Sequence, residues 1–111
     1  MPKRAARVDA NQPEIVEKLR EAGCSVFITS DVGQGFSDIV VGLRGMNYLL
    51  EIKDGDKSPS RRQLTEAEKE FSKNWRGQYG VVLDVADAFF EVGLINRQEW
   101  RGLKKDNERR R

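Results

Sequence analysis

The fold of this chain follows from residues 38–53, which read DIVVGLRGMNYLLEIK. Two runs rich in β-branched and other large apolar residues, 38–43 and 47–53, stand on either side of a short turn at residues 44–46. Runs of this kind predict strands, and strands separated by so few residues predict an antiparallel hairpin. We therefore expect a β-hairpin near the middle of the chain.

The position of the turn decides which charged residues of the hairpin face one another. A two-residue turn at 44–45 pairs Asp38 with Glu51, whereas a turn at 45–46 pairs Asp38 with Lys53. Side chains alternate between the two faces of a strand, so in both registers these three side chains share one face. A slip by one residue would move them into the apolar face, which the core disfavours.

The other face of the hairpin is apolar and is expected to pack on a helix. Its side chains are those of Ile39, Val41, Leu43, Tyr48, Leu50 and Ile52. The elements predicted outside the hairpin are a helix over about residues 12–22, a strand over 24–29, a helix over 66–75, a strand over 79–85 and a short helix over 86–92, with another helical turn over 94–103. A strand that follows a helical crossover is expected to run parallel to an earlier strand. The sequence thus predicts the α/β class, with one domain and a mixed four-stranded sheet flanked by helices in the order α-β-β-β-α-β-α.

Charge divides the chain into three parts. The 20 Lys and Arg residues and the 18 Asp and Glu residues give a net charge of only +2, but basic residues gather at both ends. We predict a basic N-terminal arm over residues 1–8, a domain over 9–96 and a basic C-terminal tail over 97–111. Basic ends suit a polyanion such as nucleic acid, and solvated, disordered ends have the same composition.

The absence of histidine and the single cysteine, Cys24, exclude several kinds of chemistry. One cysteine makes no disulfide within the chain and no thiolate metal cluster, and no mechanism that needs imidazole is available. This cysteine usage suits the reducing cytoplasm. No apolar run approaches the roughly 20 residues that span a bilayer, and none follows the basic N-terminus, so we expect no membrane partner and no secretory signal.

The three charged residues of the hairpin are candidates for a metal site. Charged side chains are rare inside strands unless they are paired or bound to a cation, and two adjacent carboxylates repel each other. Mg²⁺ and Mn²⁺ prefer oxygen ligands, so the candidate ligands are Asp38, Glu51 and the backbone carbonyl of Ile52. Lys53 would orient water or stabilise charge that develops on a phosphate. The alternative is a structural ion pair between Lys53 and Asp38 or Glu51 at the edge of the sheet.

The motif Gly35-Phe36-Ser37-Asp38, followed on the next strand by Glu51-Ile52-Lys53, resembles the PD-(D/E)XK nuclease superfamily. It looks most like the small stand-alone virus-type replication-repair nucleases, the VRR-NUC family. The similarity covers roughly residues 9–85 and implies a restriction-endonuclease-like fold. It implies that Asp38 and Glu51 bind the divalent metal and that Lys53 is catalytic. It also implies a catalytic role for Glu14 on the first helix, although Glu14 equally suits the first turn of a helix, where it complements the dipole.

Two positions depart from the family pattern. Ser37 stands where the family usually has proline, which holds no ligand. Glu68 stands where the family tends to carry glutamine at the start of the next helix, and Gln63 is out of register. Glu68 would then either assist the metal or serve only as the capping partner of Thr65.

The resemblance predicts a Mg²⁺- or Mn²⁺-dependent nuclease that acts on DNA as an endonuclease and prefers branched or structured substrates. Lys57, Arg61 and Arg62, which follow the motif, are candidates to grip phosphates, as well as residues of a solvated loop. Because a short chain has little surface to hold branched DNA, we expect a homodimer. The alternatives are a nuclease for single strands, RNA or modified DNA, and a non-catalytic nucleic-acid-binding or assembly module that keeps the fold.

Overall fold

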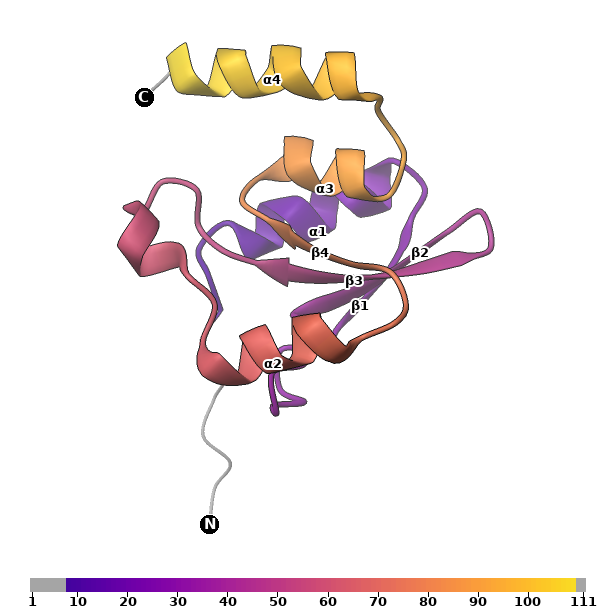
Figure 1. Cartoon of the computed structure of the whole chain (residues 1–111). Coiled ribbons are helices and arrows are strands. Elements are labelled where there is room, and N and C mark those ends of the chain that lie inside the picture. The colour runs from indigo at the N-terminus through magenta and orange to yellow at the C-terminus, as the bar shows by residue number, and fades with distance from the viewer. Residues whose placement is uncertain (1–7, 110–111) are drawn as a thin grey trace.

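The predicted hairpin forms the middle of a four-stranded sheet (Figure 1). The computed structural model describes residues 8–109. In chain order its elements are α1 (Gln12–Glu21), β1 (Ser25–Ile28), β2 (Ile39–Leu43), β3 (Met46–Ile52), the 3₁₀ helix η1 (Pro59–Arg62), α2 (Glu66–Asn74), β4 (Tyr79–Val82), α3 (Val85–Glu91) and α4 (Arg97–Arg109). The strands lie in the order β1-β2-β3-β4, with β3 and β4 parallel and the other pairs antiparallel. The predicted α/β class, mixed sheet and order of elements are confirmed.

The hairpin turns at Arg44 and Gly45, the first of the two predicted registers. Leu43 pairs with Met46, so two residues form the tip. Both have positive φ angles, 52° at Arg44 and 80° at Gly45. This is the conformation of the tight turn whose twist matches that of the flanking strands. It places Asp38, which precedes β2, across from Glu51 on β3.

Two helices cover the apolar face of the sheet and one covers the other face. In Figure 1, α1 and α3 lie on one side of the sheet and α2 lies on the opposite side. The buried core between α1, α3 and the sheet consists of Ile15, Val16, Leu19, Cys24, Ile39, Val41, Leu50, Ile52, Val82, Ala88 and Val92. The predicted apolar face of the hairpin is therefore the core face. The charged side chains of the hairpin face α2.

The helix α2 is fixed at its start by a capping box and along its length by aromatic rings. The Thr65 hydroxyl accepts a hydrogen bond from the Glu68 amide, and the Glu68 carboxylate accepts one from the Thr65 amide. The Phe71 ring packs on Phe36 at 5.3 Å and on Tyr79 at 5.9 Å between ring centroids. These contacts hold the first turn of α2 over the charged face of the hairpin.

The C-terminal part of the described chain is a helix that packs on α3. The strand β4 ends at Val82, earlier than predicted, because the Asp84 side chain caps α3 by accepting a hydrogen bond from the Asp87 amide. On α4, Lys104 Nζ lies 2.7 Å from Asp84 and 3.0 Å from Asp87, and the Trp100 indole donates to Asp87. Most of the segment predicted as a basic tail is thus α4, whose positive charge partly serves this contact.

Part of the domain prediction concerns residues that the structure does not describe. Residues 1–7, most of the predicted basic arm, and residues 110–111 lie outside the described part of the chain. Within residues 8–109, no helix combines the length and the apolar character that crossing a bilayer requires.

Candidate active site

Four charged side chains meet between the hairpin and α2. Asp38 is the residue before β2, Glu51 lies near the end of β3, Lys53 directly follows β3, and Glu68 lies in the first turn of α2. Lys53 Nζ lies 3.6 Å from Glu51 Oε2 and 2.9 Å from Glu68 Oε1. The carboxyl groups of Asp38 and Glu51 lie close enough for each to shift the pKa of the other. The structure therefore brings together the three hairpin residues that the sequence singles out, and adds Glu68.

Glu51 is a buried carboxylate with an unsatisfied oxygen. Its side chain is 3% exposed, and Oε1 has no hydrogen-bond partner within the described residues. Burial, and then the neighbouring carboxyl groups of Asp38 and Glu68, raise the pKa of Glu51 to about 10. At neutral pH this group holds a proton unless a positive charge stabilises its ionised form.

Asp38 is tied to the backbone of the opposite strand. Its Oδ2 accepts a hydrogen bond of 2.7 Å from the backbone amide of Ile52. Burial raises the pKa of Asp38, although contact with Glu51 and the bond from Ile52 act in the opposite direction. The bond fixes the Asp38 carboxylate beside the main chain at residues 51–52.

Lys53 is charged and held by carboxylates. Burial disfavours its ammonium form, but the hydrogen bond to Glu68 and the charges of Glu68, Glu51 and Asp38 outweigh burial and raise the pKa of Lys53. For Glu68, burial is likewise outweighed by the bonds from Lys53 and the Thr65 amide, and the pKa of Glu68 is lowered. The Lys53 ammonium is thus hydrogen-bonded to Glu68 and also lies 3.6 Å from Glu51 Oε2, so one positive charge is shared among the carboxyl groups of the site.

The donor set fits one divalent cation held by two carboxylates. Within residues 8–109, no group of three or more Asp, Glu, Cys or His side chains is arranged as a metal site. Mg²⁺ in proteins commonly uses one or two carboxylates and keeps several waters. The unpartnered Oε1 of Glu51, next to Asp38 and the Ile52 backbone, is an oxygen that a cation would satisfy. We therefore judge Asp38, Glu51 and the Ile52 carbonyl as the residues able to hold such an ion.

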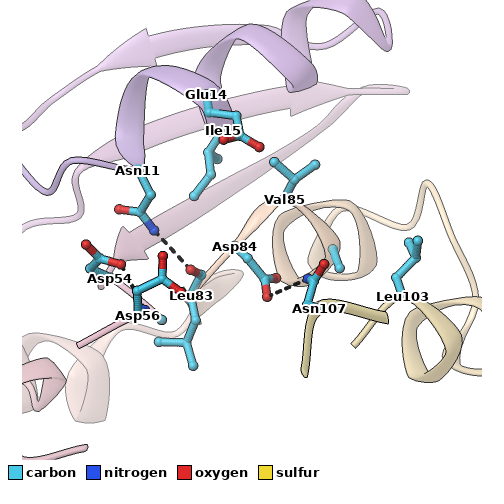
Figure 2. Close-up of a pocket in the computed structure, with 12 residues that line it drawn as sticks. Asn11, Glu14, Ile15, Asp54, Asp56, Leu83, Asp84, Val85, Leu103 and Asn107 are labelled. Carbon is cyan, nitrogen blue, oxygen red and sulfur yellow. Dashed lines mark hydrogen bonds between the residues drawn. The ribbon is translucent and has the colours of Figure 1, made fainter. Parts of the chain in front are cut away.

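Glu14 does not join this group. It is exposed in the first turn of α1, which packs on the apolar face of the sheet. There it lines a pocket together with Asp54, Asp84 and Asn11, whose amide donates to the Leu83 carbonyl at 2.9 Å (Figure 2). Its position suits the role of complementing the helix dipole. A catalytic role for Glu14 stays a prediction, because no hydrogen bond or ion pair joins Glu14 to these charged residues in the described part of the chain.

Two of the three candidate phosphate-binding residues already have partners. Lys57 pairs with Asp9 at 3.2 Å, and the Arg62 guanidinium donates to the Gly55 carbonyl at 3.1 Å. The Arg61 side chain on η1 is exposed and has no hydrogen bond or ion pair with the rest of the described chain. Arg61 is therefore the member of this set that is best placed to reach a phosphate.

Tyr79 is a polar group near the site that the sequence pattern did not single out. It lies on β4 beside Leu49, on the same face of the sheet as Glu51. Its hydroxyl is buried and has no hydrogen-bond partner among the described residues. Burial, and then the charges of Glu51, Glu68 and Asp38, raise the pKa of Tyr79, so the phenol stays protonated. Only strand alternation could have indicated it, because nothing in its local sequence is unusual.

Comparison of the chain with protein-family models, curated proteins and solved structures finds no match. The resemblance to the PD-(D/E)XK nucleases therefore rests on the motif residues alone.

Proposed function

We propose that this protein is a nuclease that uses Mg²⁺ or Mn²⁺ to hydrolyse phosphodiester bonds of DNA. The observation that carries the proposal is the buried, unpartnered carboxylate oxygen of Glu51 next to Asp38 and the ammonium of Lys53. A buried carboxyl pair whose nearest ammonium is already bonded to a third carboxylate weakens the fold, so its presence favours a role in binding a cation. Endonucleolytic cutting and a preference for branched DNA follow from the motif resemblance only.

In this proposal each residue has a separate task. Asp38, Glu51 and the Ile52 carbonyl hold the divalent cation, which supplies Lewis-acid charge near the scissile phosphate. Lys53 presents an ammonium that donates to the phosphate and stabilises the negative charge that grows on it during hydrolysis. Arg61 contacts a neighbouring phosphate and positions the strand. Cys24, buried in the core, takes no part.

Replacing Lys53 by alanine tests the proposal. Loss of an electrostatic donor of this kind is expected to lower kcat by roughly two orders of magnitude or more. Lys69→Ala is the matched control, because Lys69 is exposed on α2 and its ammonium pairs only with Glu66 among residues 8–109. We expect its activity to stay within about twofold of wild type.

The assay uses duplex, flap, four-way-junction and single-stranded DNA, with matching RNA, in Mg²⁺, Mn²⁺ or EDTA. Cleavage that requires the cation and is lost in Lys53→Ala supports the proposal. DNA retention without cleavage under all conditions would instead indicate a binding module. Equal cleavage by wild type and Lys53→Ala would reject the assignment of Lys53.

We further propose that the protein acts as a homodimer through the exposed edge of the sheet. β1 is an edge strand, and the side chains of Phe27 and Ile28 on it are 72% and 51% exposed. Their side chains point to opposite faces of the strand and so flank this edge on both sides, where a strand of a second copy paired with β1 would cover both. Sedimentation should give a dimer for wild type and a monomer for Phe27→Asp. Met46→Asp, which changes an exposed apolar residue at the hairpin tip, should remain dimeric; a monomeric wild type would contradict the proposal.

A further inference from the structure

One oxygen of Glu68 links the catalytic lysine to the start of α2. Glu68 Oε1 accepts a hydrogen bond from Lys53 Nζ at 2.9 Å and another from the Thr65 amide at 2.8 Å. The Glu68 amide in turn donates to the Thr65 hydroxyl at 3.2 Å. The Glu68 carboxylate is therefore held by the backbone amide of Thr65 as well as by Lys53, and the Thr65 hydroxyl hydrogen-bonds only with the Glu68 amide within the described residues.

Lys53 depends on this oxygen for its position. A lysine side chain is a flexible four-carbon stem that carries a point charge, so its ammonium stays in place only where an acceptor holds it. The distance of 2.9 Å to Glu68 is that of a hydrogen bond, whereas 3.6 Å to Glu51 Oε2 is beyond one. Glu68 is thus the closest carboxylate to the ammonium.

The same contact keeps Glu51 available. Without the Glu68 carboxylate, the nearest carboxylate to Lys53 Nζ is Glu51. An ammonium that moves onto Glu51 would neutralise the carboxylate that the cation needs. Removal of the Glu68 charge should therefore affect both the position of Lys53 and the binding of the cation.

We infer that Glu68 is the positioning residue for Lys53, holding its ammonium toward the substrate and away from Glu51. This inference rests on the proposed nuclease function. Under this inference, Glu68 is neither a third metal ligand nor a residue that only caps α2. The cap itself does not require the charge, because glutamine fills this place in capping boxes as well.

Glu68→Gln tests the inference with little change to the fold. Its amide oxygen can still accept from the Thr65 amide, while Lys53 loses its charged partner. We expect kcat to fall between about tenfold and a hundredfold, the cost of a misplaced catalytic group, while KM for DNA stays within about twofold. We also expect a higher Mn²⁺ concentration for half-maximal activity.

Two further variants separate positioning from capping. Glu66→Gln removes a charge from the same helical turn. The Glu66 side chain is 92% exposed and, in the described part of the chain, pairs only with Lys69, so kcat should stay within about twofold of wild type. Thr65→Ala removes the capping hydroxyl and leaves Glu68 in place. It should lower the unfolding midpoint but change kcat much less than Glu68→Gln does. A loss of kcat in Thr65→Ala as large as in Glu68→Gln would overturn the inference, as would wild-type kinetics in Glu68→Gln.

A spectroscopic measurement tests the contact without any cleavage. In ¹⁵N-labelled protein, the Lys53 ammonium should give a resolved, slowly exchanging signal in wild type and in Glu66→Gln. The signal should broaden or disappear in Glu68→Gln. If wild type cleaves no substrate, the proposed function has failed, and this signal alone decides the inference: the same Lys53 signal in wild type and Glu68→Gln overturns it.

Discussion

Glutamine in place of Glu51 is expected to stabilise the cation-free protein at pH 8 and to abolish cleavage. The change keeps the shape of the side chain and removes a buried carboxyl group whose Oε1 has no partner. Burial and the adjacent carboxyl groups raise the pKa of Glu51 from 4.5 to about 10. At pH 8 the folded protein therefore retains a proton that the unfolded chain releases. This difference lowers the free energy of unfolding of the wild type.

The sign of the pH dependence follows from the two pKa values. Below pH 4.5 both states hold the proton, so Glu51 contributes no penalty. Between 4.5 and about 10 only the folded state holds it, so the free energy of unfolding of wild type falls as pH rises. The increase in the free energy of unfolding caused by Glu51→Gln should thus be small at pH 5 and on the order of 2 kcal/mol at pH 8.

Urea unfolding in EDTA at the two pH values measures this gain. Glu17→Gln, an exposed change on α1, serves as the control and should alter stability by less than about 0.5 kcal/mol at both. A gain in stability that is the same at pH 5 and pH 8, or a loss at pH 8, would contradict the assignment of Glu51 as a buried carboxyl group with a raised pKa.

A divalent cation should offset the destabilisation that the buried Glu51 causes at pH 8. Ionised Glu51 is stabilised by a bound cation, so excess Mn²⁺ at pH 8 should raise the unfolding midpoint of wild type. It should leave Glu51→Gln nearly unchanged, because glutamine contributes no charge. Cleavage by Glu51→Gln should fall by roughly three orders of magnitude. If Mn²⁺ stabilises both proteins equally, the cation binds elsewhere.

The hairpin could be predicted because residues that are close in sequence determine its faces and its register. Alternation of apolar and charged side chains identifies the two faces, and the two-residue turn sets the register that places Asp38 across from Glu51. The three charged residues of the hairpin therefore meet in the structure as the sequence indicates. Their roles in catalysis remain predictions, since geometry alone does not reveal a reaction.

The residues that come from other elements could not be placed in the same way. Glu68 and Glu14 both lie in the first turn of a helix, where an acidic residue suits the dipole. Only the packing of each helix on a particular face of the sheet separates them: α2 covers the charged face and α1 the apolar face. Likewise, Lys104 belongs to a segment whose charge suggests a tail, and its pairing with Asp84 depends on how α4 lies on α3.

The close approach of α2 to the loop before Asp38 leads to a second large expected effect, at Gly35. This residue has a φ of 77°, and a Cβ there would clash with the backbone carbonyl of Ala67 and lie 2.9 Å from the amide nitrogen of Glu68. A flexible side chain can change rotamer to relieve such a clash, but the backbone atoms of a capped helix cannot. Gly35→Ala should therefore cost about 3 kcal/mol or more of the free energy of unfolding.

Gly33→Ala provides a matched control in the same loop. Gly33 has a similar φ of 80°, but a Cβ there meets nothing within 4 Å. Its substitution should cost only the conformational penalty of about 1–2 kcal/mol. Urea unfolding of the two variants separates the clash from the backbone strain, and equal losses would show that α2 does not pack on Gly35.

Activity extends this comparison to the site. Any Gly35→Ala protein that folds must move the start of α2, and Glu68 moves with it. Its kcat should then fall even under conditions where it is fully folded, whereas Gly33→Ala should cleave at the wild-type rate. Gly35 thus influences the position of Lys53 through two contacts: the close approach of Gly35 to the backbone of α2, and the hydrogen bond from the Lys53 ammonium to Glu68 on that helix.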